Sequence, residues 1–215
     1  MNYLYWKEKK IKDFSPENIS NLYENGFVFT RIDRGIMHQT RSARIDIEKF
    51  EFSSENRRIL KKIEKIKINE KKIPYEDYSW EIGKMAKDFY DSRGVRFGVS
   101  RIKKLIIDEG NFNTLLKYYD TGSNLGYTIC YKNEKMLHYS YPFYDINKST
   151  KDMGLGMMTK AILYAKEKKL KYIYLGSLQR QGDTYKLQFA NLEWFDGKNW
   201  SKDTKKVKMI LNESK

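Results

Sequence analysis

The stretch Asp152–Gly176, DMGLGMMTKAILYAKEKKLKYIYLG, contains the most regular pattern in this chain of 215 residues. Met158, Ile162 and Ala165 recur at helical spacing after two closely spaced glycines, which predicts an amphipathic helix. Three lysines are expected in its last turn, where positive charge suits the helix dipole: Lys166, Lys168 and Lys169. The apolar run Leu170–Gly176 then predicts a short buried strand, so the helix is expected to lead directly back to a sheet.

Upstream of this helix, three segments alternate apolar and polar residues and predict consecutive antiparallel strands: Thr114–Tyr119, Leu125–Tyr131 and Met136–Tyr144. Short turn sequences separate them, and a further strand is expected over Thr184–Trp194. A meander, a helix and a strand in this order predict an α+β fold, in which the late helix crosses one face of a mainly antiparallel sheet.

The first third of the chain predicts a smaller α/β region. A helix is expected from Pro16 to Tyr23, between the capping residue Ser15 and the stop at Asn25-Gly26. The other expected elements are strands over Phe27–Thr30 and Arg44–Phe50, a helix from Ser53 to Ile66, and helices over Tyr78–Tyr90 and Val99–Asp108. We therefore predict an N-terminal region over residues 1–73 and a main domain over residues 74–215.

The formal net charge of +14 indicates an anionic partner, for which nucleic acid, nucleotide phosphates and an anionic membrane surface are the candidates. The positive charge is concentrated between Arg57 and Lys72, where eight Lys or Arg accompany two Glu. A lysine-rich face that is merely solvated is the competing interpretation.

The single cysteine, Cys130, and the lack of zinc-type ligand pairs predict a reducing compartment and no metal. The first residues lack the pattern of a signal peptide, and no apolar run is long enough to span a bilayer. We expect a cytoplasmic protein with no membrane partner. The sequence does not indicate an oligomeric state.

Four further segments, together with Asp152–Gly176, give the chain a resemblance to a known family. They are ENGFVFTRIDRG (24–35), RSARIDIEKFEFSSENRRILKK (41–62), MLHYSYPFYD (136–145) and TYKLQFANLEWFDGKNW (184–200). In this order they resemble the arginyl-tRNA–protein transferases and their bacterial leucyl-transferring relatives, the aminoacyltransferases of the N-end rule. The resemblance covers roughly Pro16 to Trp200. It implies a GNAT-like main domain that transfers an amino acid from aminoacyl-tRNA to the N-terminus of a protein or peptide.

The chain departs from this family in one region. The family carries a cysteine cluster between its two early strands, whereas the corresponding stretch here is RGIMHQT, Arg34–Thr40. No metal or haem role is therefore carried over, and no cofactor is expected beyond aminoacyl-tRNA as co-substrate. Gln179 and Arg180 stand where the family continues with aromatic residues, and we expect them to contact the substrate.

Catalytic residues are expected near the predicted last strands. Tyr185 and Lys186 match the family's Tyr-Lys element, and Lys186 has the charge to pair with a phosphate or an acidic acceptor. Tyr139, Tyr141 and Tyr144 alternate with Ser140 and Phe143 along a strand, so the tyrosine hydroxyls are expected to line a cleft between strands. Asp145, at the strand end, has the chemistry to orient an amine or accept its proton. Packing tyrosines, a strand-edge lysine and a turn-capping aspartate are the structural alternatives.

Substrate-binding residues are expected at two helices. Arg57 and Arg58 match the family's Arg-Arg pair, of which one arginine is expected to contact phosphate. Lys151, Gly154 and Gly156 resemble the GNAT turn that presents backbone N–H groups to a phosphate, although a tight turn needed for packing has the same sequence.

Transfer from an activated ester needs positioning and oxyanion stabilisation more than a metal or a covalent nucleophile. Two other functions remain open: an acyl-CoA-dependent N-acetyltransferase that uses acetyl-CoA, and a catalytically inactive RNA-binding relative. His138, beside the tyrosine-rich run, is a further candidate for a general base.

Overall fold

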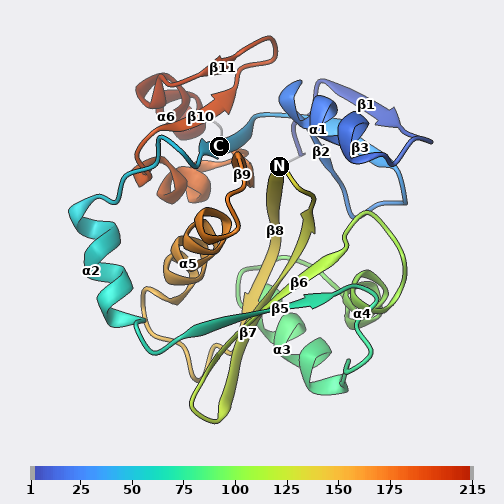
Figure 1. Ribbon diagram of the computed structural model, residues 1–215, viewed down its shortest axis with the longest axis vertical. Helices are drawn as coiled ribbons and strands as arrows, with labels where there is room; N and C mark the ends of the chain where they lie inside the picture. Colours follow the sequence, from blue (N-terminus) through green and yellow to red (C-terminus); the bar gives the residue numbers. More distant parts are fainter. Residues whose placement is uncertain (1–2, 214–215) are drawn as a thin grey trace.

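The computed structural model describes residues 3–213, which form an eight-stranded sheet, a three-stranded sheet and flanking helices (Figure 1). The strands of the large sheet are β4 (Ser42–Asp46), β5 (Lys67–Lys72), β6 (Thr114–Asp120), β7 (Ser123–Lys132), β8 (Met136–Tyr144), β9 (Tyr172–Ser177), β10 (Leu192–Phe195) and β11 (Trp200–Ser201). Their order is β11-β10-β4-β9-β8-β7-β6-β5. Only β8 and β9 are parallel; all other neighbours in this sheet pair antiparallel.

The parallel pair follows from the crossover that the sequence predicts. Helix α5 (Met153–Glu167) connects β8 to β9 and packs on both strands. A connection between parallel neighbours must cross the sheet, and a helix commonly provides it. The predicted meander β6–β7–β8 and the α+β fold class with a mainly antiparallel sheet are confirmed.

The three-stranded sheet belongs to the N-terminal region. It contains β1 (Lys7–Lys10), β2 (Phe27–Phe29) and β3 (Ile36–Gln39) in the order β1-β3-β2, and α1 (Pro16–Glu24) precedes β2. The Ser15 hydroxyl accepts a hydrogen bond from the Asn18 amide, as predicted for a cap. The predicted smaller α/β region is therefore present.

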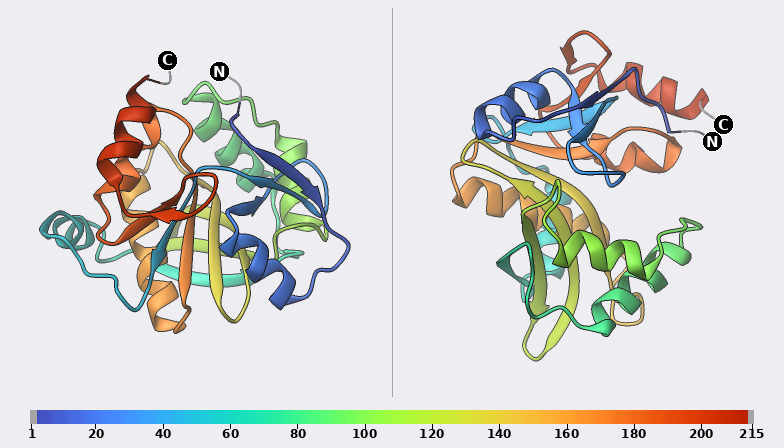
Figure 2. Two further views of the ribbon diagram at one scale, coloured as in Figure 1. Left: turned by 90° about the horizontal axis from the view of Figure 1, so that it is seen from above. Right: turned by 90° about the vertical axis from the view of Figure 1, so that its right-hand side faces the viewer.

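The remaining helices lie on both sides of the large sheet (Figures 1 and 2). They are α2 (Ser54–Lys62), α3 (Trp80–Asp91), α4 (Val99–Ile107), the 3-10 helix η1 (Gln181–Gln188) and α6 (Thr204–Glu213). Helix α2 packs on α5, whereas α3 packs on β8 and on α4. None of the helices between residues 3 and 213 has the length and apolar character needed to cross a bilayer.

The structure corrects several predicted boundaries. The strand expected over Arg44–Phe50 is β4, Ser42–Asp46, and the helix expected to reach Ile66 ends at Lys62. Lys168 caps α5, and Lys169 follows the helix with φ 54°, so neither lies in the last turn. The strand expected over Thr184–Trp194 is wrong for its first half, which forms η1. Five elements were not predicted: β1, β3, β5, β11 and α6.

The division at residue 73 stays a prediction. The large sheet takes β4 and β5 from one side of that boundary and six strands from the other. Both parts also contribute to one continuous buried hydrophobic cluster.

Candidate active site at the gap between β8 and β9

Strands β8 and β9 pair over only three positions and then separate. Met136, Leu137 and His138 pair with Tyr172, Ile173 and Tyr174. Beyond this point β8 pairs only with β7, and β9 only with β4. A gap therefore opens in the middle of the sheet, where unpaired backbone groups and strand ends are available to a ligand.

Bulges shape both strands at the gap. Ser140 is the extra residue on β8, because Ile129 faces Tyr141 while Cys130 faces Tyr139. On β9, the register against β4 shifts next to Gly176, whose φ of 77° is a left-handed conformation that glycine adopts without strain. Bulges redirect side chains and are frequent beside active sites. Here they bend β8 and β9 away from each other.

Two clefts lie against the gap. We call the first the lysine cleft; it has a volume of about 380 Å³ and includes His138, Ser140, Tyr141, Gln179, Arg180, Asp183 and Lys186 in its lining. We call the second the helix cleft; it has a volume of about 270 Å³ and includes Arg93, Tyr139, Tyr144, Lys151, Asp152, Gly154 and Tyr185. Because His138 and Tyr141 line one cleft and Tyr139 and Tyr144 the other, β8 forms the wall between them.

Helix η1 connects the two clefts. Its adjacent residues Tyr185 and Lys186 line the helix cleft and the lysine cleft, respectively. The sequence singled out both residues but placed them in a strand. The structure places them on η1 instead, where adjacent side chains also point in different directions.

Lys186 is a buried cation. Its Nζ donates to the Ser177 carbonyl oxygen at 2.9 Å and lies 3.3 Å from an Asp183 carboxylate oxygen. Burial by itself lowers the pKa of Lys186, but the neighbouring Tyr185 and Asp183 outweigh it, and the pKa lies above its ordinary value. Lys186 therefore stays charged at neutral pH and supplies fixed positive charge to the lysine cleft.

Asp183 holds this part of the site together. One carboxylate oxygen accepts hydrogen bonds from the amides of Gln179 and Arg180, at 2.9 and 3.2 Å, and the other faces Lys186. Asp183 is the only carboxylate among the described residues that line the lysine cleft. Its bonding fixes the turn after β9, so it acts here as a positioning residue. No sequence pattern singled out Asp183 for this role.

Tyr141 lies opposite this charged group, in contact with Phe97 and Phe112. Burial raises the pKa of Tyr141 to about 12. The phenol is therefore protonated at neutral pH and is a hydrogen-bond donor rather than a base.

His138 is neutral and already engaged. The Tyr23 hydroxyl accepts from the Phe29 amide, so its own proton is available to His138 Nδ1, 2.8 Å away. That bond assigns the imidazole hydrogen to Nε2. Burial, and then the positive charge of Lys186, lower the pKa of His138 to about 3. His138 is therefore a weak base, contrary to the role considered for it from sequence.

The buried His138 predicts a loss of stability in mild acid. The unfolded chain binds a proton at this site below pH ~6.5, whereas the folded chain binds it only near pH 3. Folding then releases a proton, so stability falls as pH drops through this window. Between pH 6.5 and 4.5, His138 alone should lower the free energy of unfolding by about 2–3 kcal/mol.

Urea unfolding of the wild type and of His138→Gln at pH 7 and 4.5 measures this loss of unfolding free energy. We expect the variant to lose less stability on acidification. Equal losses in the two proteins would show that His138 does not resist protonation.

The helix cleft is formed around the N-terminus of α5. Asp152 occupies the N-cap position, but its side chain does not cap the helix. It pairs instead with Lys62 at 2.5 Å and lies 3.7 Å from Arg58, and the Lys62 bond lowers the pKa of Asp152. Uncapped backbone N–H groups at a helix N-terminus form an anion site. Gly154 and Lys151 line the cleft at this end of the helix.

Arg93 forms the other side of the helix cleft. It donates to the Tyr144 hydroxyl at 2.8 Å, and its guanidinium lies over the Phe89 ring at 3.7 Å. Tyr144 in turn lies against Gly154, where a Cβ would come within 3.5 Å of its ring. No sequence pattern singled out Arg93, because the segment after α3 lies far from α5 in the chain.

Four other predicted residues lie outside the two clefts. Asp145 caps a turn by accepting from the Asn147 amide. Arg57 donates to the Phe52 carbonyl, and Arg58 pairs with Glu55 and lies near Asp152. Gly156 is buried in α5, where a Cβ would lie 2.8 Å from Ile63 of the segment after α2. The two glycines thus lie inside the helix rather than before it, and Gly156 allows close packing.

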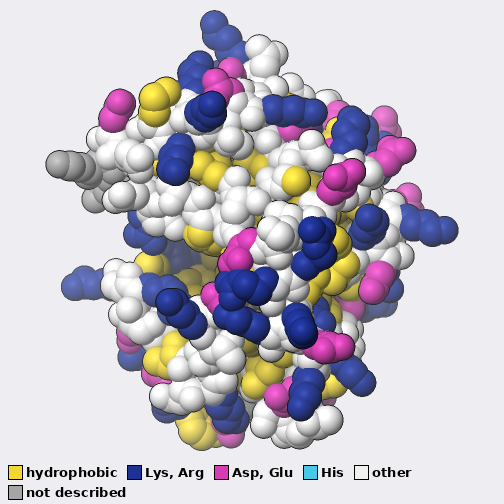
Figure 3. Space-filling view, turned by 90° about the vertical axis from the view of Figure 1, so that its left-hand side faces the viewer, with side chains coloured by type: hydrophobic (Ala, Val, Ile, Leu, Met, Phe, Trp, Pro, Cys, Tyr) yellow, Lys and Arg dark blue, Asp and Glu magenta, His cyan; other side chains and the backbone are white. Residues whose placement is uncertain are grey.

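Among residues 3–213, no three His, Cys, Asp or Glu side chains gather closely enough to hold a metal ion. On one face of the molecule, a hollow between its upper and lower parts contains hydrophobic side chains and is bordered by Lys and Arg (Figure 3).

The fold is similar to that of a solved structure. The C-terminal domain (DUF2156) of a protein assigned as a lysylphosphatidylglycerol synthetase from Agrobacterium fabrum superimposes with a TM-score of 0.53 and 12% identity, over 79% of this chain and 55% of that one. The GNAT-like fold class expected from the sequence is confirmed. L-PGS from Bacillus licheniformis gives 0.48 and 12%, over 75% and 52% of the two chains. A GCN5-related glucosamine N-acetyltransferase region of a fungal GH3 β-N-acetylglucosaminidase gives 0.48 and 9%, over 86% and 23%.

No known family model matches the sequence, and no curated protein is similar to it in sequence. The chain spans about half the length of the first two structures named above.

Proposed function

We propose that this chain is an acyltransferase, with a phosphate-bearing acyl carrier bound in the helix cleft and a primary amine bound in the lysine cleft. The single observation that carries the proposal is the gap between β8 and β9, against which both clefts lie. A carrier and an amine that meet there would react in an effectively intramolecular step.

We further propose that the carrier is an aminoacyl-tRNA and that the acceptor is the N-terminus of a protein or peptide. The support is the net charge of +14 together with the position of α2 next to the helix cleft. Lys61 and Lys65, on and just after α2, are exposed, and neither forms an ion pair within the described chain. A carrier with a polyanionic body would use such cations, whereas a small carrier would not.

The reaction would form an amide bond between the amine nitrogen and the ester carbonyl carbon. The ester bond to the ribose oxygen breaks, and that oxygen leaves with a proton derived from the amine. Lys186 and the protonated Tyr141 are the groups that would stabilise the oxyanion of the tetrahedral intermediate. Tyr185, beside Lys186, would contact the carrier end. Asp145 has no part in this step, because it lines neither cleft.

An acyl-CoA-dependent N-acetyltransferase is the second candidate. The observation that favours it is the uncapped N-terminus of α5, which would bind the phosphates of any carrier, including coenzyme A. The two candidates share the site and differ in the carrier.

Transfer of a labelled amino acid from a mixture of charged tRNAs to a synthetic peptide tests the first candidate. We expect label in the peptide and its loss after ribonuclease treatment. Acetylation of the peptide from acetyl-CoA, with no transfer from tRNA, would identify the second candidate. Salt-dependent RNA binding without either transfer would indicate an RNA-binding protein without catalytic activity.

The double variant Lys61→Glu/Lys65→Glu should weaken tRNA binding at 0.1 M salt by about 10-fold or more and reduce the salt dependence by about two phosphate contacts. Its unfolding free energy should change by less than about 0.5 kcal/mol, because both side chains are exposed. Lys62 is left unchanged, because it neutralises Asp152.

The matched control is Lys103→Glu/Lys104→Glu on α4, at the opposite edge of the molecule (Figure 1). It makes the same change in net charge with exposed lysines that also lack an ion pair. Equal weakening by the two double variants would mean that overall charge, and not the α2 surface, attracts the RNA.

A further inference from the structure

The segment Tyr3–Trp6, which we call the strap, immediately precedes β1, which begins at Lys7, and its residue Tyr3 lines the lysine cleft. Gln179, which lies 175 residues further along the chain, bonds both main-chain polar groups of Leu4 in this segment. The Leu4 amide donates to Gln179 Oε1 at 2.8 Å, and Gln179 Nε2 donates to the Leu4 carbonyl at 3.0 Å. The Thr40 hydroxyl donates to the same carbonyl at 2.7 Å.

This contact uses the main chain of Leu4 and not its side chain. A primary amide offers one acceptor and two donors, so Gln179 can satisfy both the N–H and the C=O of one residue in an extended chain. Such a contact accepts a polypeptide of almost any sequence. Gln179 itself is held by a bond from its Nε2 to the Thr40 hydroxyl at 2.8 Å, which fixes the orientation of its amide.

The strap is oriented so that Tyr3, and not Trp6, lies in the cleft. Trp6 packs on Phe195 and lies near Gly197, outside the cleft. Leu4 follows at Gln179, and Tyr3 lines the cleft itself, beside Ser177 and Lys186. A peptide acceptor would approach the gap in this same direction, since its amino group must lead.

We propose that Gln179 forms a main-chain recognition subsite for a polypeptide acceptor and that the strap occupies this subsite until an acceptor displaces it. That the polypeptide recognised there is an acyl acceptor rests on the proposed function, whereas the existence of the subsite does not. An acceptor can displace the strap, because the strap lies outside the β1–β3 pairing. That pairing covers Lys7–Lys10, and the strap adds one backbone hydrogen bond, from the Trp6 amide to the Gln39 carbonyl. Among residues 3–213, the main-chain hydrogen bonds of Leu4 are to side chains, those of Gln179 and Thr40.

A binding assay without any acyl carrier tests this proposal on the full chain. The probe is the peptide Tyr-Leu-Tyr-Trp-Lys, which copies residues 3–7, with fluorescein at its C-terminus. Leu4→Pro in the protein removes the amide that donates to Gln179, and we expect it to increase probe affinity about 10-fold by freeing the subsite. Gln179→Ala added to Leu4→Pro should reverse that gain. The control peptide Tyr-Pro-Tyr-Trp-Lys should bind weakly to every form.

Two results would overturn the proposal. One is an unchanged or lower affinity of Leu4→Pro, which would make the strap a fixed wall of the cleft. The other is equal affinity with and without Gln179. Thermal unfolding of each variant checks that the fold is retained.

The subsite and the proposed function can fail separately. If the probe binds as expected but no carrier supports transfer, the proposed function fails and the subsite stands. If the protein acylates small amines but probe affinity does not change as expected in the variants, the subsite proposal fails and the proposed acyltransferase function stands.

Discussion

Lys186→Met is expected to lower the rate of acyl transfer at least about 100-fold at saturating substrates, which corresponds to about 2.7 kcal/mol of transition-state stabilisation. Lys186 is buried, stays protonated and lines the lysine cleft. A fixed cation in a poorly solvated site stabilises a developing oxyanion without reorganising water. Methionine keeps the apolar stem but removes the charge. The turnover number with charged tRNA and peptide measures the effect.

The same substitution should cost only about 1–3 kcal/mol of folding stability. It removes the donor to the Ser177 carbonyl, while Asp183 keeps its two backbone N–H donors. Lys186→Arg, which restores the charge, should recover part of the rate, and Lys198→Met, at an exposed turn, should leave it unchanged. A loss of rate no larger than the loss of folded protein would show that Lys186 is only structural.

The charge of Lys186 also determines how the rate of transfer should depend on pH. Because the pKa of Lys186 lies above its ordinary value, the residue does not titrate between pH 6 and 9. The pH profile of transfer in that range should therefore report the amine of the acceptor and not this lysine.

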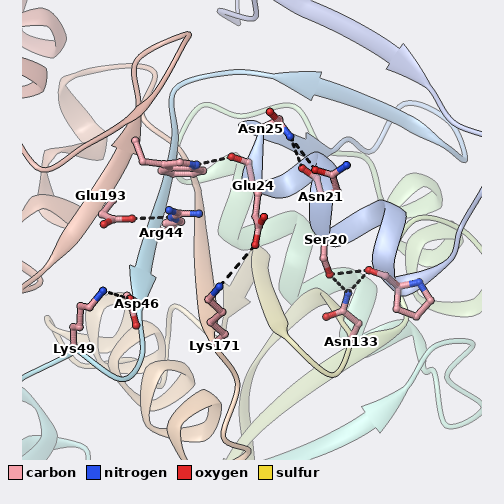
Figure 4. Close-up of polar contacts among 12 residues, drawn as sticks. Ser20, Asn21, Glu24, Asn25, Arg44, Asp46, Lys49, Asn133, Lys171 and Glu193 are labelled. Carbon is pink, nitrogen blue, oxygen red and sulfur yellow. Dashed lines mark hydrogen bonds and ion pairs between the residues drawn. The ribbon is translucent and has the colours of Figure 1, made fainter.

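Arg44→Ala is expected to lower the free energy of unfolding by about 3–5 kcal/mol and the midpoint of thermal unfolding by about 10 °C. Arg44 on β4 is 8% exposed and pairs with Glu193 on β10 at 2.8 Å (Figure 4). Its guanidinium also lies over the rings of Trp200 and Tyr172, at 3.9 and 4.2 Å. Removing it opens a cavity and leaves the Glu193 carboxylate largely buried without its partner.

Two variants separate these causes. Lys49→Ala removes the exposed partner of Asp46, visible in the same view, and should cost less than about 1 kcal/mol. Arg44→Leu combined with Glu193→Leu removes both charges and should recover most of the stability lost in Arg44→Ala. If the double variant is as unstable as the single one, the stranded charge is not the reason for the loss.

Local sequence patterns were sufficient for the elements that surround the gap. The period of α5 and the alternation along β8 are properties of consecutive residues, and burial on a helix face or a sheet face enforces them. These two elements lie close to where they were predicted, at Met153–Glu167 and Met136–Tyr144. Tyr185 and Lys186, expected in a strand, lie on η1 and line the two clefts.

The error at Thr184–Trp194 has a specific cause. Tyr185, Leu187 and Phe189 alternate with polar residues, which is the period of a strand. In the fold, however, Asp183 accepts from the amides of Gln179 and Arg180, and Lys186 donates back to Ser177. These bonds turn the chain into η1, because satisfying buried polar groups outweighs a weak local preference for strand.

The sequence by itself determined the fold class, the crossover from β8 through α5 to β9, and the positive charge of the protein, because each depends on residues near one another in the chain or on composition alone. Tertiary structure decided the site. Arg93 meets Tyr144, Lys62 meets Asp152, and Leu4 meets Gln179 across separations of 51, 90 and 175 residues. Such contacts form only after distant elements pack, so no local period in the sequence encodes them.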